Sequence, residues 1–351
     1  MQIKNFYKYQ YVIFKTANLT NILQSGLPIQ NPNCCSLLNY SFINVMKKIV
    51  KFSTFILLMT GLTGVVSAQT NSKLPQLLIR LDDIGMNHSV NMAAQKVAET
   101  GMPVSVSLQF ACPWYQEAVD ILKKYPNVTV GVHLTLTSEW KGYRWGPVTG
   151  RTAVPSLVDS VGYFPQSNRA FNKSGYKLDE VEKELSAQIE RALGSGLKIT
   201  YIDPHMGVAL STPELRALTE KLARKYKLAI STLSSVTYFG ETYKEMWGEP
   251  IATKKKAFLA YVSNLNPDRP NLMVIHTATP SPEMDVLVDM NSKMMSDKDG
   301  NPLASKHRQT ELNMLLSPEF RSLEGKKFQL INYQQLLQGK DISVLKASAG
   351  V

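Results

Sequence analysis

The sequence predicts an α/β fold in which the strands of a parallel sheet alternate with helices. Between residues 76 and 136, three short apolar runs are separated by two stretches whose apolar residues recur at helical spacing. A strand, a helix and a second strand at this spacing are typical of βα units, which build parallel sheets. Residues 69–351 are enough for a single domain of this class with a sizeable core.

The first predicted strand lies in the stretch from Gln76 to Gly85 and ends in two adjacent carboxylates, Asp82 and Asp83. Carboxylates are costly to bury unless they are paired or bound to a cation. In α/β folds, ligands and catalytic groups gather at the C-terminal ends of the strands. The Asp pair therefore marks a candidate active site.

The next elements continue the alternation. A helix over residues 90–97, capped by Asn87 or Ser89, is followed by a strand over residues 104–110 and by a helix that opens at Pro113 and ends at Pro126. Cys112 lies before this helix and is the one cysteine after Cys34 and Cys35; it is more typical of a small buried residue than of a nucleophile.

The third predicted strand, residues 128–136, presents His133 on its polar face. Alternate residues of a strand share a face, so His133 points with Gly131 and Thr135, away from the valines that pack on helices. The alternative is that His133 is hydrogen-bonded within the core, but the small and polar residues on the same face favour a functional role for it.

Residues 138–177 show few regular patterns and are rich in aromatic residues. Long irregular loops inside a domain are commonly functional. We expect Trp140, Tyr143 and Trp145 to be exposed there and to stack on sugar rings; the alternative is that they only cover the end of the fold.

Two later strands also end at histidines. A helix around residues 181–192 leads to a strand over residues 198–203, which runs into Asp203-Pro204-His205. A carboxylate two residues from a histidine can bind the same metal or orient the imidazole. The remaining predicted elements are a helix over residues 213–226, a strand over 228–232, a strand over 271–275 that stops at His276, a helix over 310–316 and a strand over 328–331, whereas residues 234–270 show no clear pattern.

Side chains at the ends of parallel strands meet in space, so these residues predict one site. One aspartate with two histidines commonly holds a divalent metal, and we expect Asp83, His133 and His205 to be the ligands. Adjacent strand residues point in opposite directions, but Gly85 indicates that the chain is already turning at the Asp pair.

The other polar residues receive roles around this predicted metal site. Asp82 is free to act as a base, and His276 is available as an acid on the far side. Arg308 could pair with Asp82 or Asp203, and a surface ion pair is the alternative for it.

The N-terminal residues predict export to the periplasm or secretion. Lys47, Lys48 and Lys51 precede an apolar run from Phe52 to Val66, and small residues follow up to Ala68. This order is that of a signal peptide over residues 46–68, since the run is too short for a membrane span. Residues 1–45 would then be a mis-called start or an unusual extension.

The charge of the chain argues against nucleic acid as the main partner. Removing the leader with its six lysines lowers the formal net charge from +11 to +5, and no dense block of Lys or Arg remains.

Taken together, these motifs resemble the YdjC/ChbG family of carbohydrate deacetylases. The resemblance covers residues 77–337 and rests on four motifs: Leu-Asp82-Asp83-Ile-Gly85, Gly131-Val-His133-Leu-Thr-Leu-Thr137, Asp203-Pro-His205, and Ile275-His276 with Arg308-Gln-Thr-Glu311-Leu312. It implies an irregular, TIM-like (β/α) barrel related to polysaccharide deacetylases, which removes N-acetyl groups from amino sugars such as chitooligosaccharides.

The resemblance also implies the role of each residue in the site. The first carboxylate of the pair, Asp82, would be the catalytic base, and Asp83, His133 and His205 would bind the metal. The family metal is magnesium, although the two imidazoles and one carboxylate suit zinc or manganese better. The family's His-Pro-Gly is His276-Thr277-Ala278 in this chain, so the pocket wall differs.

Two other functional classes remain open at this point. The same site could serve a metal-dependent esterase or amidase that acts on a non-sugar acyl group, or the fold could belong to a carbohydrate-binding protein without catalysis.

Overall fold

Among the described residues, eight parallel strands form one sheet. The computed structural model describes residues 73–231, 237–238 and 249–341, which all belong to the unit Lys73–Val351. The strands follow the order β6-β5-β3-β2-β1-β8-β7, and β10 pairs with the N-terminal half of β1. Their bounds are β1 Gln76–Ile84, β2 Ser105–Leu108, β3 Thr129–Leu134, β5 Ile199–Pro204, β6 Ala229–Ile230, β7 Thr237–Tyr238, β8 Asn271–Ile275 and β10 Gln329–Ile331.

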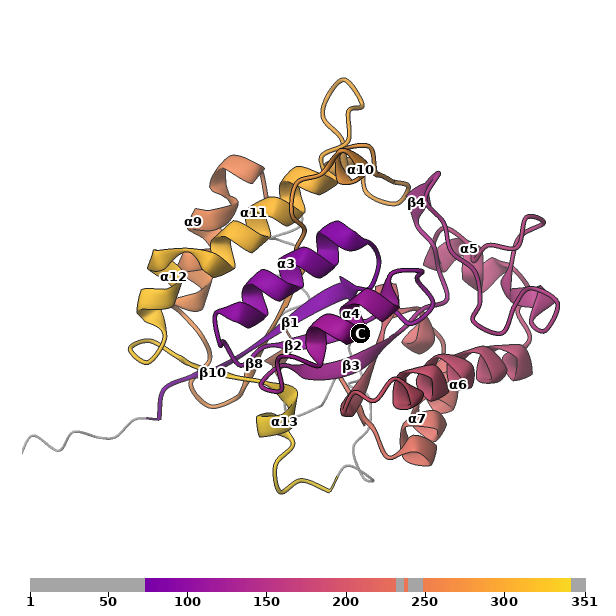
Figure 1. Ribbon diagram of the computed structural model, residues 1–351, viewed down its shortest axis with the longest axis horizontal. Helices are drawn as coiled ribbons and strands as arrows, with labels where there is room; N and C mark the ends of the chain where they lie inside the picture. Colours follow the sequence, from indigo (N-terminus) through magenta and orange to yellow (C-terminus); the bar gives the residue numbers. More distant parts are fainter. Residues whose placement is uncertain (1–72, 232–236, 239–248, 342–351) are drawn as a thin grey trace, which may run out of the picture. The chain divides into compact units, whose positions relative to one another are not determined.

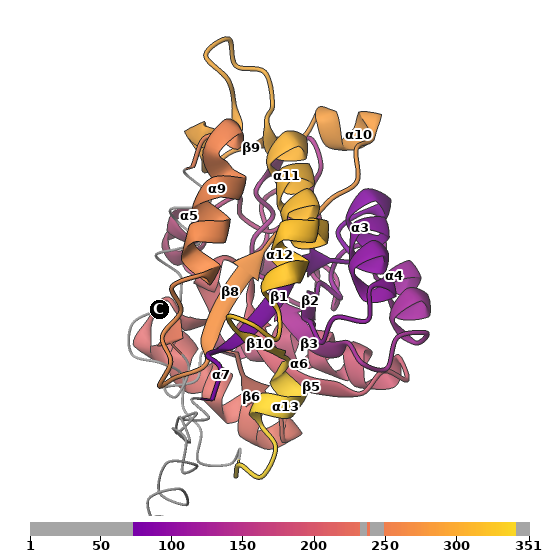
Figure 2. The same ribbon diagram turned by 90° about the vertical axis from the view of Figure 1, so that its left-hand side faces the viewer.

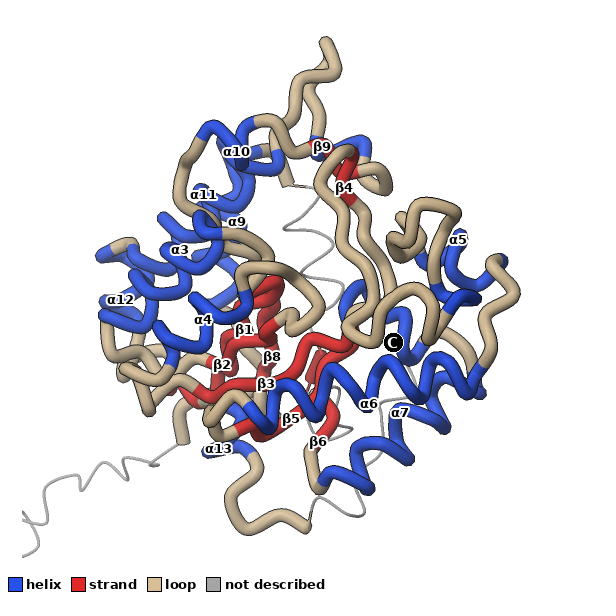
Figure 3. The backbone as a smooth tube through the Cα atoms, turned by 45° about the vertical axis from the view of Figure 1, so that its right-hand side comes forward, coloured by secondary structure: helices blue, strands red, loops and turns tan. Residues whose placement is uncertain are grey.

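The helices surround this sheet, as Figure 3 shows. In Figure 1, α3 and α4 lie over β1 and β2, while α6 and α7 lie beside β3. In Figure 2, α9, α11 and α12 form a further group next to β8. Their bounds are α3 His88–Glu99, α4 Tyr115–Leu122, α6 Leu178–Gly194, α7 Pro213–Tyr226, α9 Ile251–Val262, α11 Ala304–Leu316 and α12 Pro318–Leu323.

Short elements complete the described chain. They are α5 Asn168–Lys173, α10 Pro282–Asp285, α13 Tyr333–Leu336, the 3₁₀ turns η1 Pro155–Leu157, η2 His205–Leu210 and η3 Lys293–Met295, and an antiparallel pair of β4 Trp140–Lys141 with β9 Val288–Asp289. Among the described residues, no helix combines the length and apolarity that a membrane crossing requires.

The two faces of the strands pack against different cores. On β1, Leu77, Ile79 and Leu81 belong to the large core shared with the helices. Leu78 points to the other side and joins a smaller core, which also contains Tyr201 and residues of α13. The sheet therefore curls around an interior of its own, as expected of an irregular (β/α) barrel.

The polar residues of the interior occupy the strand positions that follow this small core. Arg80 and Asp82 on β1, His133 on β3 and Asp203 on β5 are all buried. They share the face that carries Leu78 and Tyr201, because successive inward residues are two apart. The barrel interior thus changes from apolar to charged toward the C-terminal ends of the strands.

Most helix boundaries agree with the sequence, but both ends of α4, which stops at Leu122 and not at Pro126, and the start of α11 do not. Asn87 caps α3 by accepting a hydrogen bond from the Val90 amide, as expected. The prediction that Pro113 opens a helix is wrong, because residues 109–115 form two successive turns and α4 begins at Tyr115. Helix α11 begins at Ala304, earlier than residue 310, since its first turns carry polar residues into the interior.

Gly131 has no side chain and so leaves room for the buried ring of Tyr201. This packing allows a testable prediction. A Cβ at residue 131 would lie 2.3 Å from the ring of Tyr201, whose hydroxyl donates to the Val106 carbonyl at 2.8 Å. Gly131→Ala should lower the free energy of unfolding by about 1–3 kcal/mol, the usual effect of overpacking. Urea unfolding measures it, with Gly194→Ala as the control because a Cβ there has no atom within 4 Å apart from its chain neighbours and the backbone of its own helix. Equal midpoints for the two variants would contradict the prediction.

Candidate metal centre

The end of β1 turns both carboxylates of the Asp pair toward the interior. Asp82 continues the inward face of Arg80, so Asp83 would normally point outward. Asp83 instead has a φ of +66°, and the pairing of β1 with β2 shifts register between Leu81 and Ile84. This local irregularity brings the Asp83 carboxylate to the same side as Asp82. A left-handed conformation at a non-glycine residue is strained and is found preferentially at functional sites.

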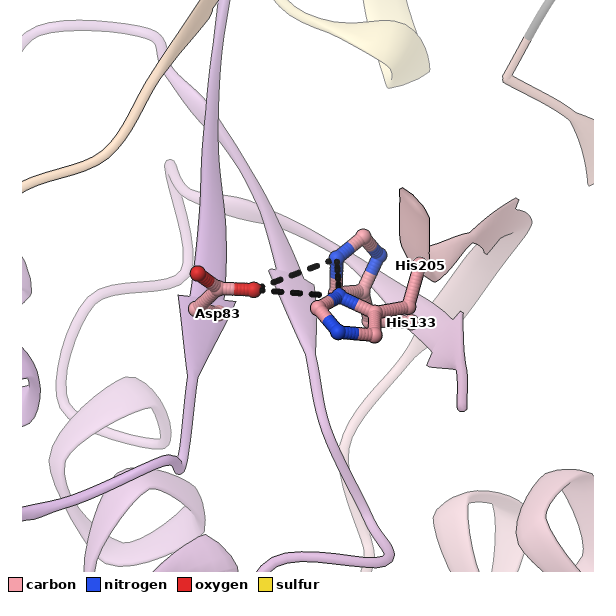
Figure 4. Close-up of side chains that lie close together, drawn as sticks. All are labelled: Asp83, His133 and His205. Carbon is pink, nitrogen blue, oxygen red and sulfur yellow. Dashed lines mark hydrogen bonds and ion pairs between the residues drawn. The ribbon is translucent and has the colours of Figure 1, made fainter. Parts of the chain in front are cut away.

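Three side chains from three strand ends converge on one point. Asp83 Oδ1 lies 3.4 Å from His133 Nε2 and 3.3 Å from His205 Nδ1, and the two imidazole nitrogens are 3.2 Å apart. Figure 4 shows the carboxylate of Asp83 facing both rings. All three residues are buried.

This triangle fits the donor set of a divalent metal. Ligands about 2.0–2.2 Å from a common ion lie about 2.8–3.1 Å from their neighbours in octahedral geometry and about 3.3–3.6 Å in tetrahedral geometry, a span of about 2.8–3.6 Å. The three observed separations agree with that range. Asp83, His133 and His205 are therefore able to hold one ion and to leave further positions for small molecules.

Each imidazole is supported at its other nitrogen by a carboxylate. Asp203 Oδ2 lies 2.7 Å from His133 Nδ1, and Glu139 Oε2 lies 3.0 Å from His205 Nε2. Such carboxylates fix the ring and leave the remaining nitrogen free of its proton for a metal. Asp203 thus orients the ring of His133, and Glu139 orients that of His205.

Two buried arginines balance part of the negative charge. Arg80 contacts Asp82 through a bidentate pair at 2.7 and 2.8 Å, and its Nη1 lies 2.6 Å from Asp203 Oδ1. Arg308 Nη2 lies 2.6 Å from Asp83 Oδ2, which leaves Oδ1 directed at the imidazoles.

The charges of the centre match a dication. With Glu139, the centre contains four carboxylates against two guanidinium groups. With both imidazoles neutral, two negative charges remain, which one divalent cation would compensate.

The pKa values of the ligand residues reflect this excess of negative charge. Burial acts to lower the pKa of His133, but nearby carboxylates, Asp82 foremost, raise it to about 9. Burial acts likewise on His205, and Glu139 is the main group that raises its pKa to about 10. Both shifts show that the centre attracts positive charge.

The carboxylates show the complementary effect. Burial acts to raise the pKa of Asp83, but Arg308 above all holds it well below its usual range. For Asp203, burial is likewise outweighed by Arg80, so the pKa falls to about 2. Both groups are therefore ionised at neutral pH.

His276 follows β8 and reaches the same carboxylate from another strand. Its Nε2 lies 3.8 Å from Asp83 Oδ2. Burial lowers the pKa of His276 to about 4 although Asp83 opposes the shift, so the imidazole is neutral at neutral pH. Its backbone N–H donates to Glu311 Oε2 at 2.8 Å, and Glu311 Oε1 lies 3.1 Å from the buried Lys254 Nζ.

The comparisons with known proteins assign the chain to a family. The family model described as YdjC-like protein matches residues 76–324. The chain belongs to the YdjC-like family.

Its relatives include proteins named carbohydrate deacetylase. This YdjC-like chain is 27% identical over 274 residues to the one from Brevibacillus brevis, an alignment that covers 74% of this chain and 99% of the relative. It is 32% identical over 155 residues to the one from Geobacillus stearothermophilus, which covers 44% of this chain and 58% of the relative.

A solved structure supports the fold. An Enterococcus faecalis protein named for cellobiose-phosphate cleavage has a crystal structure that matches with a TM-score of 0.58 and 24% identity. The match covers 75% of the YdjC-like chain and 99% of the other.

The structure places several predicted site residues differently from the sequence expectations. Arg308 pairs with Asp83, not with Asp82 or Asp203, and it is buried, so a surface ion pair is excluded. Asp203 contacts the imidazole of His133 in the neighbouring strand, since the two residues are directly paired in the sheet.

The expectation of exposed aromatic platforms is wrong for the two tryptophans. Trp140 is 1% and Trp145 is 3% exposed. The Arg308 guanidinium lies 5.3 Å from the ring centroid of Trp140, and Trp145 packs edge-on near His205. Tyr143 is partly buried, and its hydroxyl donates to the Met86 carbonyl. These aromatic residues therefore form the wall around the charged centre.

Three residues of the centre were not predicted from the sequence. Arg80 and Gln109 have the strand parity of the inward face, and this signal could have identified both. Glu139 lies in the irregular segment after β3, where no periodicity indicates the direction of a side chain.

Proposed function

We propose that this protein is a metal-dependent hydrolase that removes N-acetyl groups from amino sugars or their oligosaccharides. The convergence of Asp83, His133 and His205, with Asp82 beside them, is the observation that carries the proposal. Relatives named carbohydrate deacetylase support the carbohydrate substrate. The ion would be zinc or manganese on ligand type, while the family resemblance favours magnesium.

The ion would be held by Asp83 Oδ1, His133 Nε2 and His205 Nδ1. A divalent cation there supplies a Lewis acid for the acetyl carbonyl and lowers the pKa of water. Asp203 and Glu139 keep the two imidazoles oriented, and Arg308 keeps the Asp83 carboxylate in place.

Asp82 is the proposed general base. Its carboxylate is fixed by the bidentate contact with Arg80, and one of its oxygens lies within 4.8 Å of a ring nitrogen of His133. It would remove the proton of the water whose oxygen attacks the acetyl carbon. A fixed base needs no reorganisation during the reaction.

His276 is the proposed proton donor for the leaving group. When the bond between the acetyl carbon and the sugar nitrogen breaks, the nitrogen needs a proton to leave as an amine. The His276 ring lies on the Oδ2 side of Asp83, away from the Oδ1 that faces the metal ligands. Because the ring is neutral in the resting site, its second proton would have to arrive during turnover, with Asp82 as the source. The products are acetate and the free amino sugar.

Acetate release tests the proposal. Chelator-treated protein is supplied with zinc, manganese or magnesium and assayed on N-acetylated oligosaccharides and, in parallel, on an aryl acetate ester. We expect acetate from the amino sugars only when metal is present. Turnover of the ester alone would show an esterase, and a protein that binds sugar without turnover would show a binding protein; either result would refute the deacetylase.

We also propose that the protein is exported. This proposal concerns residues outside the described part of the chain. Residues 46–68 would direct export and be removed after Ala68. Mass spectrometry of the protein produced in a bacterial host is expected to find an exported form that begins at Gln69. A form that stays in the cytoplasm with residues 46–68 intact would contradict it.

A further inference from the structure

Gln109 places a side-chain amide beside two of the three proposed metal ligands. It follows β2 on the inward face and is fully buried. Its Nε2 lies 3.3 Å from Asp83 Oδ1 and 3.2 Å from His205 Nδ1. These separations equal those among the three ligand atoms themselves. The end of the amide thus occupies the place of a neighbouring ligand in one coordination shell.

The amide nitrogen lies against the atoms that would otherwise face the cation. The amide N–H donates to Asp83 Oδ1 and so satisfies a lone pair that a metal would use, and the same amide nitrogen lies beside His205 Nδ1. A dication at the same point repels these N–H hydrogens. Rotation of the amide by about 180° instead presents its carbonyl oxygen, which is a suitable ligand for divalent cations.

Cys112 can serve both orientations of the amide. Its Sγ lies 3.1 Å from Gln109 Oε1, and the residue is buried. A thiol donates weakly to an oxygen and accepts weakly from an N–H, so either end of the amide finds a partner.

We infer that Gln109 is a fourth protein ligand of the divalent cation and binds it through the side-chain oxygen. The inference rests on the proposed metal site and extends it. A neutral amide adds an oxygen ligand without changing the charge balance of the site. It also explains why a polar side chain is fully buried just after β2, where only Cys112 and the metal ligands are its side-chain partners among the described residues.

Two substitutions separate a ligand from a mere hydrogen-bond donor. Gln109→Met keeps the length of the side chain and removes both the oxygen and the donor. Gln109→Glu keeps an oxygen that can bind metal but has no N–H to donate to Asp83. A donor role is therefore lost in both variants, whereas a ligand role is lost only in the first.

Cobalt binding provides the test, because the visible spectrum of Co²⁺ reports the number and type of its ligands. Full-length wild-type protein and both variants are titrated with Co²⁺ after chelation, with Gln95→Met on α3 as the control. Gln95 hydrogen-bonds Glu99 on the same helix. We expect Gln109→Met to weaken binding about 10-fold or more and to change the spectrum. Gln95→Met should keep the wild-type spectrum, and Gln109→Glu should keep the band intensity that reports the number of ligands. Both variants should bind Co²⁺ at least as tightly as wild type.

Three results would overturn the inference. Gln109→Met could bind Co²⁺ like wild type, which would show that the amide is not a ligand. Gln109→Glu could bind as weakly as Gln109→Met, which would assign a donor role to Gln109. If wild-type protein binds no Co²⁺ at all, the proposed metal site fails together with the inference.

Discussion

Asp82→Asn is expected to lower kcat for acetyl removal about 10²–10⁴-fold, the usual effect of losing a positioned general base. The metal should remain bound, because Asp83, His133 and His205 are unchanged. Asparagine also keeps one oxygen for the contact with Arg80, which still pairs with Asp203 at 2.6 Å. The measurement combines acetate release with the metal content of the same sample.

Asp83→Asn is the matched control for that prediction, since it alters the neighbouring carboxylate of the same strand. It should lower metal content and activity together. If Asp82→Asn instead loses metal and activity in equal proportion, the roles of the two carboxylates are reversed.

Lys254→Met is expected to lower the free energy of unfolding by about 3–5 kcal/mol, because it leaves a buried carboxylate without its charged partner. The side chains of Lys254 and Glu311 are 0% and 2% exposed. Glu311 would keep only the backbone N–H of His276 among its described partners. Chemical unfolding measures the loss.

The adjacent residue provides the control for this second prediction. Lys255 pairs with Glu319 at 2.9 Å, but both side chains are exposed. Lys255→Met should change stability by about 0–1 kcal/mol, as surface pairs do. An effect of Lys254→Met no larger than that of Lys255→Met would refute a structural role for the buried pair.

Strand parity was enough to predict the inward direction of His133. Its neighbours Gly131 and Thr135 share the polar face, and the structure buries His133 in the interior as this pattern requires. Asp83 could not be predicted in this way, since its direction depends on a positive φ that only the folded chain reveals.

Helix α9 was missed for a physical reason. Its inward face carries Lys254, Phe258 and Val262, so a lysine takes the first of three core positions at helical spacing. A charge at a core position breaks the apolar pattern from which helices are predicted. The ion pair with Glu311, on α11, makes this lysine compatible with burial.

The aromatic residues of the segment after β3 show that composition alone does not predict whether a side chain is exposed or buried. Trp140 contacts Arg308 and Trp145 contacts His205 in the charged centre. The sequence alone does not show whether such aromatic side chains are buried around a site or exposed to a ligand. Regular elements reveal direction through their period, whereas irregular segments such as the one that holds Glu139 do not.

Titration of the chelator-treated protein with zinc, manganese and magnesium, followed by calorimetry and acetate release, tests most directly whether one cation at this centre supports hydrolysis. We expect one equivalent of metal per chain, recovery of acetate release at the same stoichiometry, and loss of both in His205→Ala. Full activity without metal, or equal binding by wild type and His205→Ala, would contradict the metal centre assigned to Asp83, His133 and His205.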